Sequence, residues 1–455
     1  MTKDMTQGNA LKLILQFALP LLIGNILQQT YNVIDAAIVG RYLGAEALGG
    51  VGASTSIQFM VIGFCMGLCN GFSVPVARDF GAGDHKRMRK DIFHAYFLLV
   101  VFAVVLTLLC TVFCTQILHI LSVPDNIFHD AYAYLFVIFA GIPFTLLYNL
   151  LAGILRAVGD SRTPFIFLAI SSGLNIILDI ICIVVFQWGC AGAAIATVTA
   201  QAISGISCLI LIIKKYHALR LNRTDCVLAG EYVREMLGMG VPMGLQFSIT
   251  AIGSMVMQSA NNSLGSIFVS GFAAAAKIKM FLMSPIDALS TGVSVFCSQN
   301  LGARKLDRIK EGWKKGTVIG VAYGVLAGMC MIFFGRHASL LFISGADVAV
   351  LDASAKYLKC MGFFFWSLGI LNVCRLTVQG LGFSGRAVFS GVTEMFARII
   401  VSFGFVATYG YTAICFADQS AWITATIYIV ITSVFCLRKI AKDLDKPVDS
   451  RQNAC

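Results

Sequence analysis

Polar residues recur along one face of the first long apolar stretch, which runs from Leu11 to Gly40. Spacings of three, four and three place the following residues on one side of a helix: Asn25, Gln28, Asn32 and Asp35. The stretch is long enough to cross a bilayer, and a carboxylate facing lipid would cost about 2.5–3.5 kcal/mol to insert. This face is therefore predicted to look into protein or water, and Asp35 is a candidate functional residue.

Apolar stretches of about 20 residues recur along the whole chain, and each is long enough for a membrane-spanning helix. Twelve such spans are predicted, at residues 11–39, 50–76, 92–118, 128–155, 164–187, 190–213, 238–262, 268–297, 313–335, 348–380, 387–409 and 413–437. The predicted fold class is an all-α integral membrane protein with about 12 transmembrane helices.

Composition supports this class, since 58% of the 455 residues are hydrophobic and 13% are charged. The net charge of +11 is distributed unevenly. Basic residues gather in alternate loops and at the C-terminus, within 78–90, 214–234, 304–315 and 438–451. By the positive-inside rule these segments and both termini are cytoplasmic. The charge is therefore a topology signal, and no nucleic-acid partner is expected.

The second half of the chain repeats the first at an offset of about 222 residues. The segment from Gly71 to Asp84 has a counterpart from Gly292 to Lys305, and Pro20 has one in Pro242. Further matches pair Tyr134 with Tyr357, Asn149 with Asn372, Gly159 with Gly382 and Ser161 with Ser384. Well-separated matches at nearly one offset indicate two homologous halves.

Each half holds six predicted spans, so both halves enter the membrane in the same orientation. They are then related by a pseudo-twofold axis along the bilayer normal, as in the parallel repeats of secondary transporters. We assign an N-lobe at 1–213, a cytoplasmic linker at 214–236, a C-lobe at 237–440 and a cytoplasmic tail at 441–455. This plan predicts a central cavity that opens to either side by rocking of the lobes.

A second group of polar residues lies in the fifth and sixth predicted spans. Asn175 and Asp179 are one helical turn apart, as are Thr197 and Gln201. Together with Asp35 they offer two carboxyl groups, an amide and a hydroxyl to one lobe. Neighbouring carboxyl groups at low dielectric suit proton uptake and release near neutral pH, and the same oxygens suit sodium. For Asn175 and Thr197, hydrogen bonding between helices is the structural alternative.

The second half does not repeat this arrangement. Its first span has a polar face that includes Gln258, but Met257 stands where Asp35 would map. The remaining charges considered within its spans are Asp287, Arg375, Glu394 and Arg398. Glu394 and Arg398 are four residues apart on a helix and are expected to form an internal ion pair. Asp287 either faces the cavity or pairs elsewhere.

Sequence motifs of other classes are missing. The 15 cysteines have no zinc-type CxxC spacing, and there is no GxxxxGK[ST] phosphate loop. We therefore expect no catalytic residues and no cofactor, with an ion gradient as the source of energy.

Together these features resemble the multidrug and toxic compound extrusion (MATE) family, in its bacterial branch. The resemblance covers essentially the whole chain. It rests on Pro20 and Asp35, the Gly71-to-Asp84 segment, LRAVGDSRTP from Leu155 to Pro164, the Asn175 and Asp179 pair, GAAIAT from Gly192 to Thr197, and the doubled six-span plan. It implies an antiporter in the bacterial inner membrane that exports cationic, amphipathic organic compounds in exchange for protons or sodium. We expect it to act as a monomer.

The resemblance also implies site residues. Family members hold the coupling ion, a proton or sodium, in the N-lobe, which carries over to Asp35, Asn175, Asp179 and Thr197. The candidates for the cavity and substrate are Tyr31, Gln28, Asn32, Gln201, Gln258 and Asp287. One branch of the family uses an acid in the seventh span, and this sequence departs from it at Met257 and Gln258.

The alternative functions are a lipid flippase and a receptor or scaffold. A flippase for a lipid-linked saccharide would need cavity cations to hold pyrophosphate, for which the candidates are Lys277, Lys279 and Arg375. A receptor or scaffold without transport activity is disfavoured, because it would have no use for the duplication or the buried acids.

Overall fold

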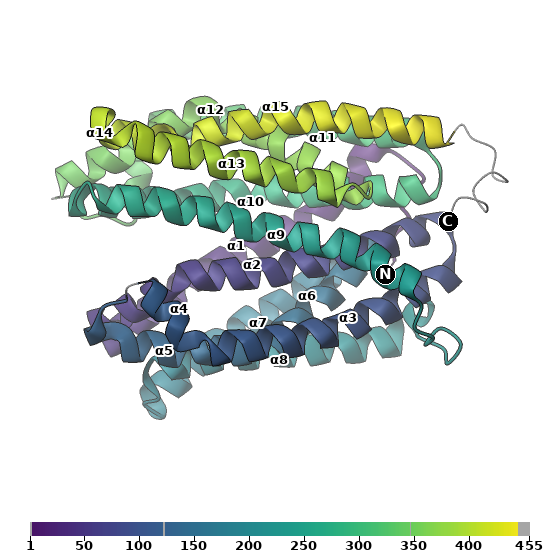
Figure 1. Ribbon diagram of the computed structural model, residues 1–455, viewed down its shortest axis with the longest axis horizontal. Helices are drawn as coiled ribbons and strands as arrows, with labels where there is room; N and C mark the ends of the chain where they lie inside the picture. Colours follow the sequence, from purple (N-terminus) through teal and green to yellow (C-terminus); the bar gives the residue numbers. More distant parts are fainter. Residues whose placement is uncertain (1, 122, 346, 445–455) are drawn as a thin grey trace. The chain divides into compact units, whose positions relative to one another are not determined.

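The computed structural model describes residues 2–121, 123–345 and 347–444, and these residues form helices joined by short connections (Figure 1). The first half contains α1 (Ala10–Leu43), α2 (Ala45–Ala82), α3 (His85–Val112), α4 (Cys114–Ile120), α5 (Asp125–Ala140), α6 (Ile142–Ala157), α7 (Arg162–Ile180), η1 (Ile181–Val185), α8 (Gly189–Lys215) and η2 (His217–Leu219). The second half contains α9 (Gly230–Asn262), α10 (Ser266–Gly302), α11 (Leu306–Ser339), α12 (Val348–Gly380), α13 (Ser384–Gly404), α14 (Val406–Tyr409) and α15 (Tyr411–Leu444).

The predicted all-α fold class is confirmed, since no strand occurs in the described part of the chain. Among those residues, 11 helices are long and apolar enough to cross a membrane, and a further span results if the bent pair α5 and α6 is counted as one. Each predicted span falls on a helix or a pair of helices. Of the predicted tail at 441–455, residues 441–444 continue α15, and the rest lies outside the described residues.

The predicted span 128–155 is interrupted near its middle. Its two parts, α5 and α6, meet at Gly141 with a bend of 48°. Pro143 lies in the first turn of α6 and has no N–H to give to the carbonyl group of the preceding turn. A Cβ atom on Gly141 would lie only 2.3 Å from the side chain of Val198. Proline and this close helix contact together explain why the span is broken.

The chain forms two compact units. The described residues of unit 1 are 2–3, 20–76 and 84–251, and those of unit 2 are 4–19, 77–83 and 252–444. Within α1 the assignment changes at Pro20, and within α9 it changes after Ala251. Each unit therefore combines helices of one half of the sequence with part of a helix from the other half.

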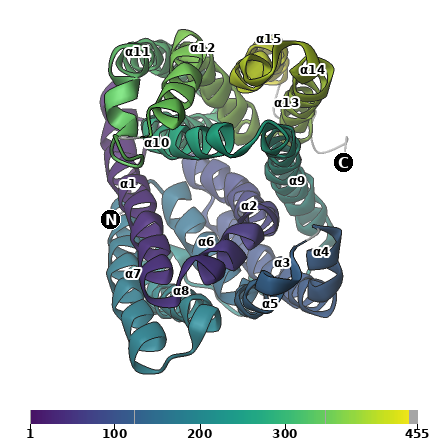
Figure 2. The same cartoon turned by 90° about the vertical axis from the view of Figure 1, so that its left-hand side faces the viewer.

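In unit 2 the long helices α11 and α12 lie side by side (Figures 1 and 2). The buried face of α11 carries glycines at four-residue spacing, namely Gly312, Gly316, Gly320, Gly324 and Gly328. A Cβ atom on Gly328 would lie 2.3 Å from the carbonyl oxygen of Gly362 on α12. Glycine is therefore required for this close approach. In lipid, where burial of apolar surface does not drive helices together, such close packing is what holds them in contact.

Unit 1 uses the same kind of contact between α2 and the first part of α9. A Cβ atom on Gly71 would lie 2.4 Å from the Cα atom of Gly240. Gly71 belongs to the duplicated segment, and this contact shows one physical reason for a glycine there.

The segment between α8 and α9 is fastened to the first turns of α3 within unit 1. The Nε atom of Arg89 donates to Oδ2 of Asp225 over 2.8 Å, and the side chain of Asp225 is about 1% exposed. The backbone N–H of Ala229 donates to Nε2 of His94 over 3.0 Å, and the His94 ring stacks on Tyr232. Polar contacts with α3 thus order a connection that has little regular structure of its own.

We predict that Asp225 keeps this connection ordered except in strong acid. Burial opposes ionisation of its carboxyl group, but the Arg89 side chain and the Asn222 backbone N–H hold the pKa below its ordinary value. A depressed folded-state pKa contributes stability at every pH above the unfolded value of about 3.9, and this contribution is lost as the pH falls through the folded value. Asp225→Asn keeps an acceptor oxygen but removes the charge that faces Arg89, and a hydrogen bond to a charged group typically contributes about 1.5–3 kcal/mol.

The measurement is amide hydrogen exchange of residues 217–229 at neutral pH. Asp225→Asn should speed this exchange by roughly tenfold or more, since each ~1.4 kcal/mol of lost protection is tenfold. Asp307→Asn in the first turn of α11 is the control and should change nothing in this segment. Equal exchange in wild type and Asp225→Asn would contradict the prediction.

Candidate ion-coupling site

Five of the predicted site residues meet inside unit 1. They come from three helices, with Tyr31 and Asp35 on α1, Asn175 and Asp179 on α7, and Thr197 on α8. Asp179 is completely buried, Asn175 is 2% exposed and Thr197 is 9% exposed. The one-turn spacing on α7 points Asn175 and Asp179 to the same side of the helix, as the sequence pattern predicts.

The centre of the site is a contact between two acids. The carboxyl groups of Asp35 and Asp179 form a hydrogen bond with each other. Two carboxyl groups can do this only when one of them holds a proton, because an ionised carboxylate is an acceptor only. The Oδ1 atom of Asp35 is also buried and has no hydrogen-bond partner among the described residues. The contact between the two acids therefore requires a proton, and Asp35 has a spare acceptor oxygen.

Neutral polar groups surround this pair and connect the three helices. The amide Nδ2 of Asn175 donates to Oγ1 of Thr197 over 3.2 Å, and the hydroxyl of Tyr31 hydrogen-bonds the same threonine. Threonine thus links α7 to α1 through its single hydroxyl group. A structural role for Asn175 and Thr197 and a role in binding an ion are compatible, since the same bonds fix their oxygens beside the acids.

Sequence reasoning missed Tyr134 and Gln58 as members of this site. Tyr134 on α5 is 5% exposed, hydrogen-bonds Gln58 on α2, and lies within electrostatic range of Asp35 and Asp179. In the sequence Tyr134 stands out only as a match of Tyr357 across the duplication. A buried tyrosine needs a partner for its hydroxyl group, and that requirement was the available signal.

The remaining candidates lie elsewhere. Gln28 on α1 is half-buried and Asn32 is exposed. Gln201 accepts a hydrogen bond from the hydroxyl of Thr145, which ties α8 to α6.

Gln258 and Asp287 belong to unit 2 and are not part of the acid cluster. Nε2 of Gln258 donates to Asn262 on its own helix over 2.8 Å. Oδ1 of Asp287 accepts from Nδ2 of Asn372 over 3.0 Å. Asp287 is thus paired with a residue of α12.

Unit 2 contains a buried network in which acids pair with cations. Asp418 on α15 accepts from Nζ of Lys279 over 2.7 Å, from the Tyr357 hydroxyl over 2.6 Å and from Nε of Arg398 over 2.9 Å. Glu394 on α13 pairs with Nη2 of Arg398 over 3.4 Å and also with Arg375 on α12. The predicted ion pair of Glu394 and Arg398 is therefore present, within a network that joins four helices.

Asp418 was not among the predicted site residues, although it is an acid inside the predicted span 413–437. Its role follows from its contacts: with Lys279, Arg398 and Tyr357 around it, its charge is fully compensated. This network also uses two of the three cations that a pyrophosphate-binding cavity would need, since Lys279 pairs with Asp418 and Arg375 with Glu394.

No group of three or more His, Cys, Asp or Glu side chains suited to a metal ion occurs among the described residues. A sodium ion at the unit 1 site would have to use the two carboxyl groups together with neutral oxygens. The hydroxyl and amide oxygens of Thr197 and Asn175 are of the right chemical kind.

The helical repeats and the paired acids define a class of protein, the polytopic membrane transporters that are built from two similar halves. The MatE family model matches this chain twice, at residues 20–181 and 242–404, which together make up more than half of it. The protein belongs to the multidrug and toxic compound extrusion (MATE) family, and it is a membrane-embedded transporter rather than an enzyme.

Individual relatives agree with this assignment. The chain is 31% identical over 420 residues to the "Probable multidrug resistance protein YpnP" of Bacillus subtilis, covering 92% of this chain and 91% of that protein. It is 23% identical over 437 residues to the "Multidrug export protein MepA" of Staphylococcus haemolyticus, covering 95% of each chain.

Solved structures show the same fold. A crystal structure of a MATE transporter in complex with MaL6 matches with a TM-score of 0.89 and 22% identity, over 97% of this chain and 100% of that one. An outward-facing structure of a multidrug resistance MATE family transporter matches with a TM-score of 0.88 and 21% identity, over 97% and 100%.

We predict that Asp418→Leu destabilises the protein strongly, because Lys279 would lose its acid and the buried Arg398 would lose one of its two acids, keeping only Glu394. Removing one partner of a buried pair typically costs about 3–5 kcal/mol. The measurement is the midpoint of thermal unfolding of the purified protein in detergent. Asp352→Asn is the matched control, since the Asp352 pair with Arg336 is exposed and should contribute only about 0–1 kcal/mol. Similar midpoints for the two variants would refute the structural role of Asp418.

Proposed function

We propose that the protein is an antiporter that exports small cationic, amphipathic organic compounds in exchange for protons or sodium. In this proposal the coupling ion binds at Asp35 and Asp179, with Asn175, Thr197 and Tyr31 holding the two acids in place. The observation that carries the proposal is the contact in unit 1 between the carboxyl groups of Asp179, which is buried, and Asp35, which is half-buried. The names of the relatives, which describe multidrug export, agree with it.

The acid pair suits exchange because its charge changes by one unit whenever an ion binds or leaves. A pair that shares one proton carries one negative charge, and a second proton or a sodium ion would neutralise it. At low dielectric the difference in electrostatic energy between the charged and the neutral pair is large. For coupling, the ion must bind one conformation of the transporter more tightly than the other, as alternating access requires.

The first helix gives the ion a mechanical route. Asp35 lies in the same helix as Pro20, which cannot donate a backbone hydrogen bond and so weakens the helix at that point. We propose that loading of the acid pair bends or repacks α1 near Pro20 and lowers the affinity for the outgoing compound.

A lipid-saccharide flippase is the weaker proposal. Its cation requirement rested on Lys277, Lys279 and Arg375, and the last two are committed to buried acids. The paired acids of unit 1 would not help to bind a pyrophosphate group. Ion-coupled export of cations uses these acids directly.

We predict that Asp35→Asn and Asp179→Asn each abolish efflux of a cationic dye while the protein stays folded in the membrane. The amide keeps the size of the side chain but cannot exchange an ion. The measurement is dye efflux from cells at matched expression. Glu46→Gln is the control, because Glu46 is an exposed acid in the first turn of α2. Dye efflux at the wild-type rate in Asp35→Asn cells would contradict the assignment of Asp35 as a coupling residue.

The same variants identify the ion in proteoliposomes. Wild-type efflux should follow either an imposed pH gradient or an imposed sodium gradient, and Asp35→Asn should remove whichever response is present. If wild type responds to one of the gradients and Asp35→Asn responds equally, coupling does not depend on this acid pair.

We further propose that both termini and the linker lie in the cytoplasm, that the membrane is the cytoplasmic membrane, and that the protein acts as a monomer. The basic loops support the orientation. Cys226, exposed in the linker, should resist a membrane-impermeant maleimide in intact cells and react in inverted vesicles. Leu341→Cys in a Cys226→Ser background should show the opposite pattern, since Leu341 is 80% exposed beyond the other end of α11. Labelling of Cys226 in intact cells would place the linker outside the cytoplasm and contradict the proposed orientation.

A further inference from the structure

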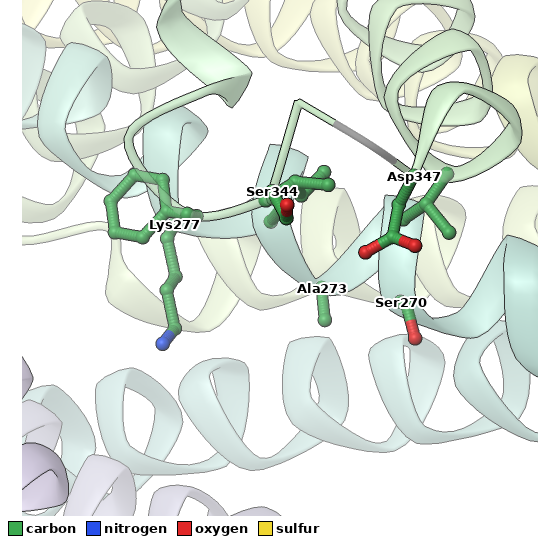
Figure 3. Close-up of a pocket in the computed structure, with 9 residues that line it drawn as sticks. Ser270, Ala273, Lys277, Ser344 and Asp347 are labelled. Carbon is green, nitrogen blue, oxygen red and sulfur yellow. The ribbon is translucent and has the colours of Figure 1, made fainter.

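Unit 2 contains a cavity of about 420 Å³ that has no part in the ion site. One wall is the first part of α10, and the other is formed by residues 342–344 after α11 together with Asp347 and Val350 (Figure 3). The residues that shape the argument are Ser270, Ala273, Lys277, Phe342, Ser344 and Asp347. Ala273 is small and leaves the middle of the cavity open.

Two opposite charges lie at opposite ends of this cavity. Figure 3 shows Lys277 on one side, Asp347 on the other and Ser344 between them. The Lys277 ammonium lies 5.6 Å from the centre of the Phe342 ring. Among the described residues neither Lys277 nor Asp347 takes part in an ion pair. The cavity therefore offers a cation and an anion that do not satisfy each other.

Polar groups of two kinds accompany the charges. Ser270 lies on α10 two turns before Lys277, and the figure places it on the Asp347 side of the cavity. At 1.5 Å per residue, the seven residues from Ser270 to Lys277 span about 10 Å. A ligand with an acidic and a basic group separated by a few ångströms would fit such a site. Its basic group would lie on the Asp347 side, where the Ser270 hydroxyl is also available.

From the length of α10 we expect the cavity to lie near the level of lipid headgroups. Lys277 lies 25 residues before Gly302, the last residue of α10, and this segment is about 38 Å long at 1.5 Å per residue. Arg304 and Lys305 follow at that end and mark a membrane surface. The hydrocarbon core is about 30 Å thick, so Lys277 reaches the headgroup region of the opposite leaflet.

Apolar surface beside the cavity fits this depth. Leu341 is 80% exposed and Val348 is 52% exposed, and both flank the connection that forms the second wall. Exposed leucine and valine next to charged groups are expected where a protein surface crosses from hydrocarbon to headgroups.

We infer that this cavity binds the phosphoethanolamine headgroup of a phospholipid, with the phosphate at Lys277 and the ammonium at Asp347. The ammonium has N–H groups to donate to a carboxylate, and the phosphate accepts from the lysine as a point charge. A choline headgroup has no N–H to donate, and a phosphoglycerol headgroup has no cation for Asp347. The site is one for binding at the membrane surface and does not depend on the Asp35 and Asp179 pair.

The test is native mass spectrometry of the full-length protein in detergent, titrated with phosphatidylethanolamine, phosphatidylcholine or phosphatidylglycerol. Wild type should retain the ethanolamine lipid in preference to the other two. Lys277→Gln and Asp347→Asn should each weaken its retention by about tenfold, the loss expected for one charge-assisted bond. Lys359→Gln and Asp352→Asn are matched controls on exposed positions of α12 and should retain the lipid as wild type does.

Thermal unfolding of each variant excludes general damage, since Lys277 and Asp347 are both exposed and their substitution should leave the midpoint unchanged. Soluble glycerophosphoethanolamine forms a further arm and should compete only weakly, because it has no acyl chains. Equal retention in wild type, Lys277→Gln and Asp347→Asn would overturn the site. Full competition by the soluble compound would overturn the lipid as its ligand.

Discussion

A charge placed in hydrocarbon must be compensated inside the protein, and this requirement organises both units. In unit 1 an acid, Asp35, lies against a second acid, Asp179. In unit 2 the acids bond to lysine and arginine, and Asp418 alone receives three donors. The second arrangement compensates its acids with the protein's own cations, whereas in our proposal the first is compensated by the coupling ion.

This division arose on a repeated framework. The tyrosines that correspond across the duplication, Tyr134 and Tyr357, are both buried, and each lies beside a carboxyl group. Near Tyr134 the acids are Asp35 and Asp179, while Tyr357 donates to Asp418. The duplication therefore preserved a buried tyrosine with an acidic neighbour, and the two halves then compensated that acid differently.

The hydrophobic pattern predicted the helices well because membrane-spanning segments must be long and apolar, whatever they contact. The acid pair was also accessible from sequence, since Asp35 and the Asn175 and Asp179 pair stand out against apolar neighbours. The partners of Asp418 and of Tyr134 were not accessible, because a residue's partners on distant helices depend on packing that periodicity does not encode. The bend at Gly141 needed the contact with Val198 as well as the proline.

The first helix is where charge and backbone meet. Residues of α1 before Pro20 belong to unit 2 and those after it to unit 1. The same covalent helix thus carries Asp35 on one side of a weakened turn and, on the other, residues that pack with unit 2. Met5 is an example of how firmly the chain before α1 is held: its backbone N–H donates to Gln299 over 2.8 Å, and its carbonyl accepts from Asn300 and Arg308. Because the chain preceding α1 is anchored in this way, the bending proposed for α1 would be easiest at Pro20, where a backbone hydrogen bond is already missing.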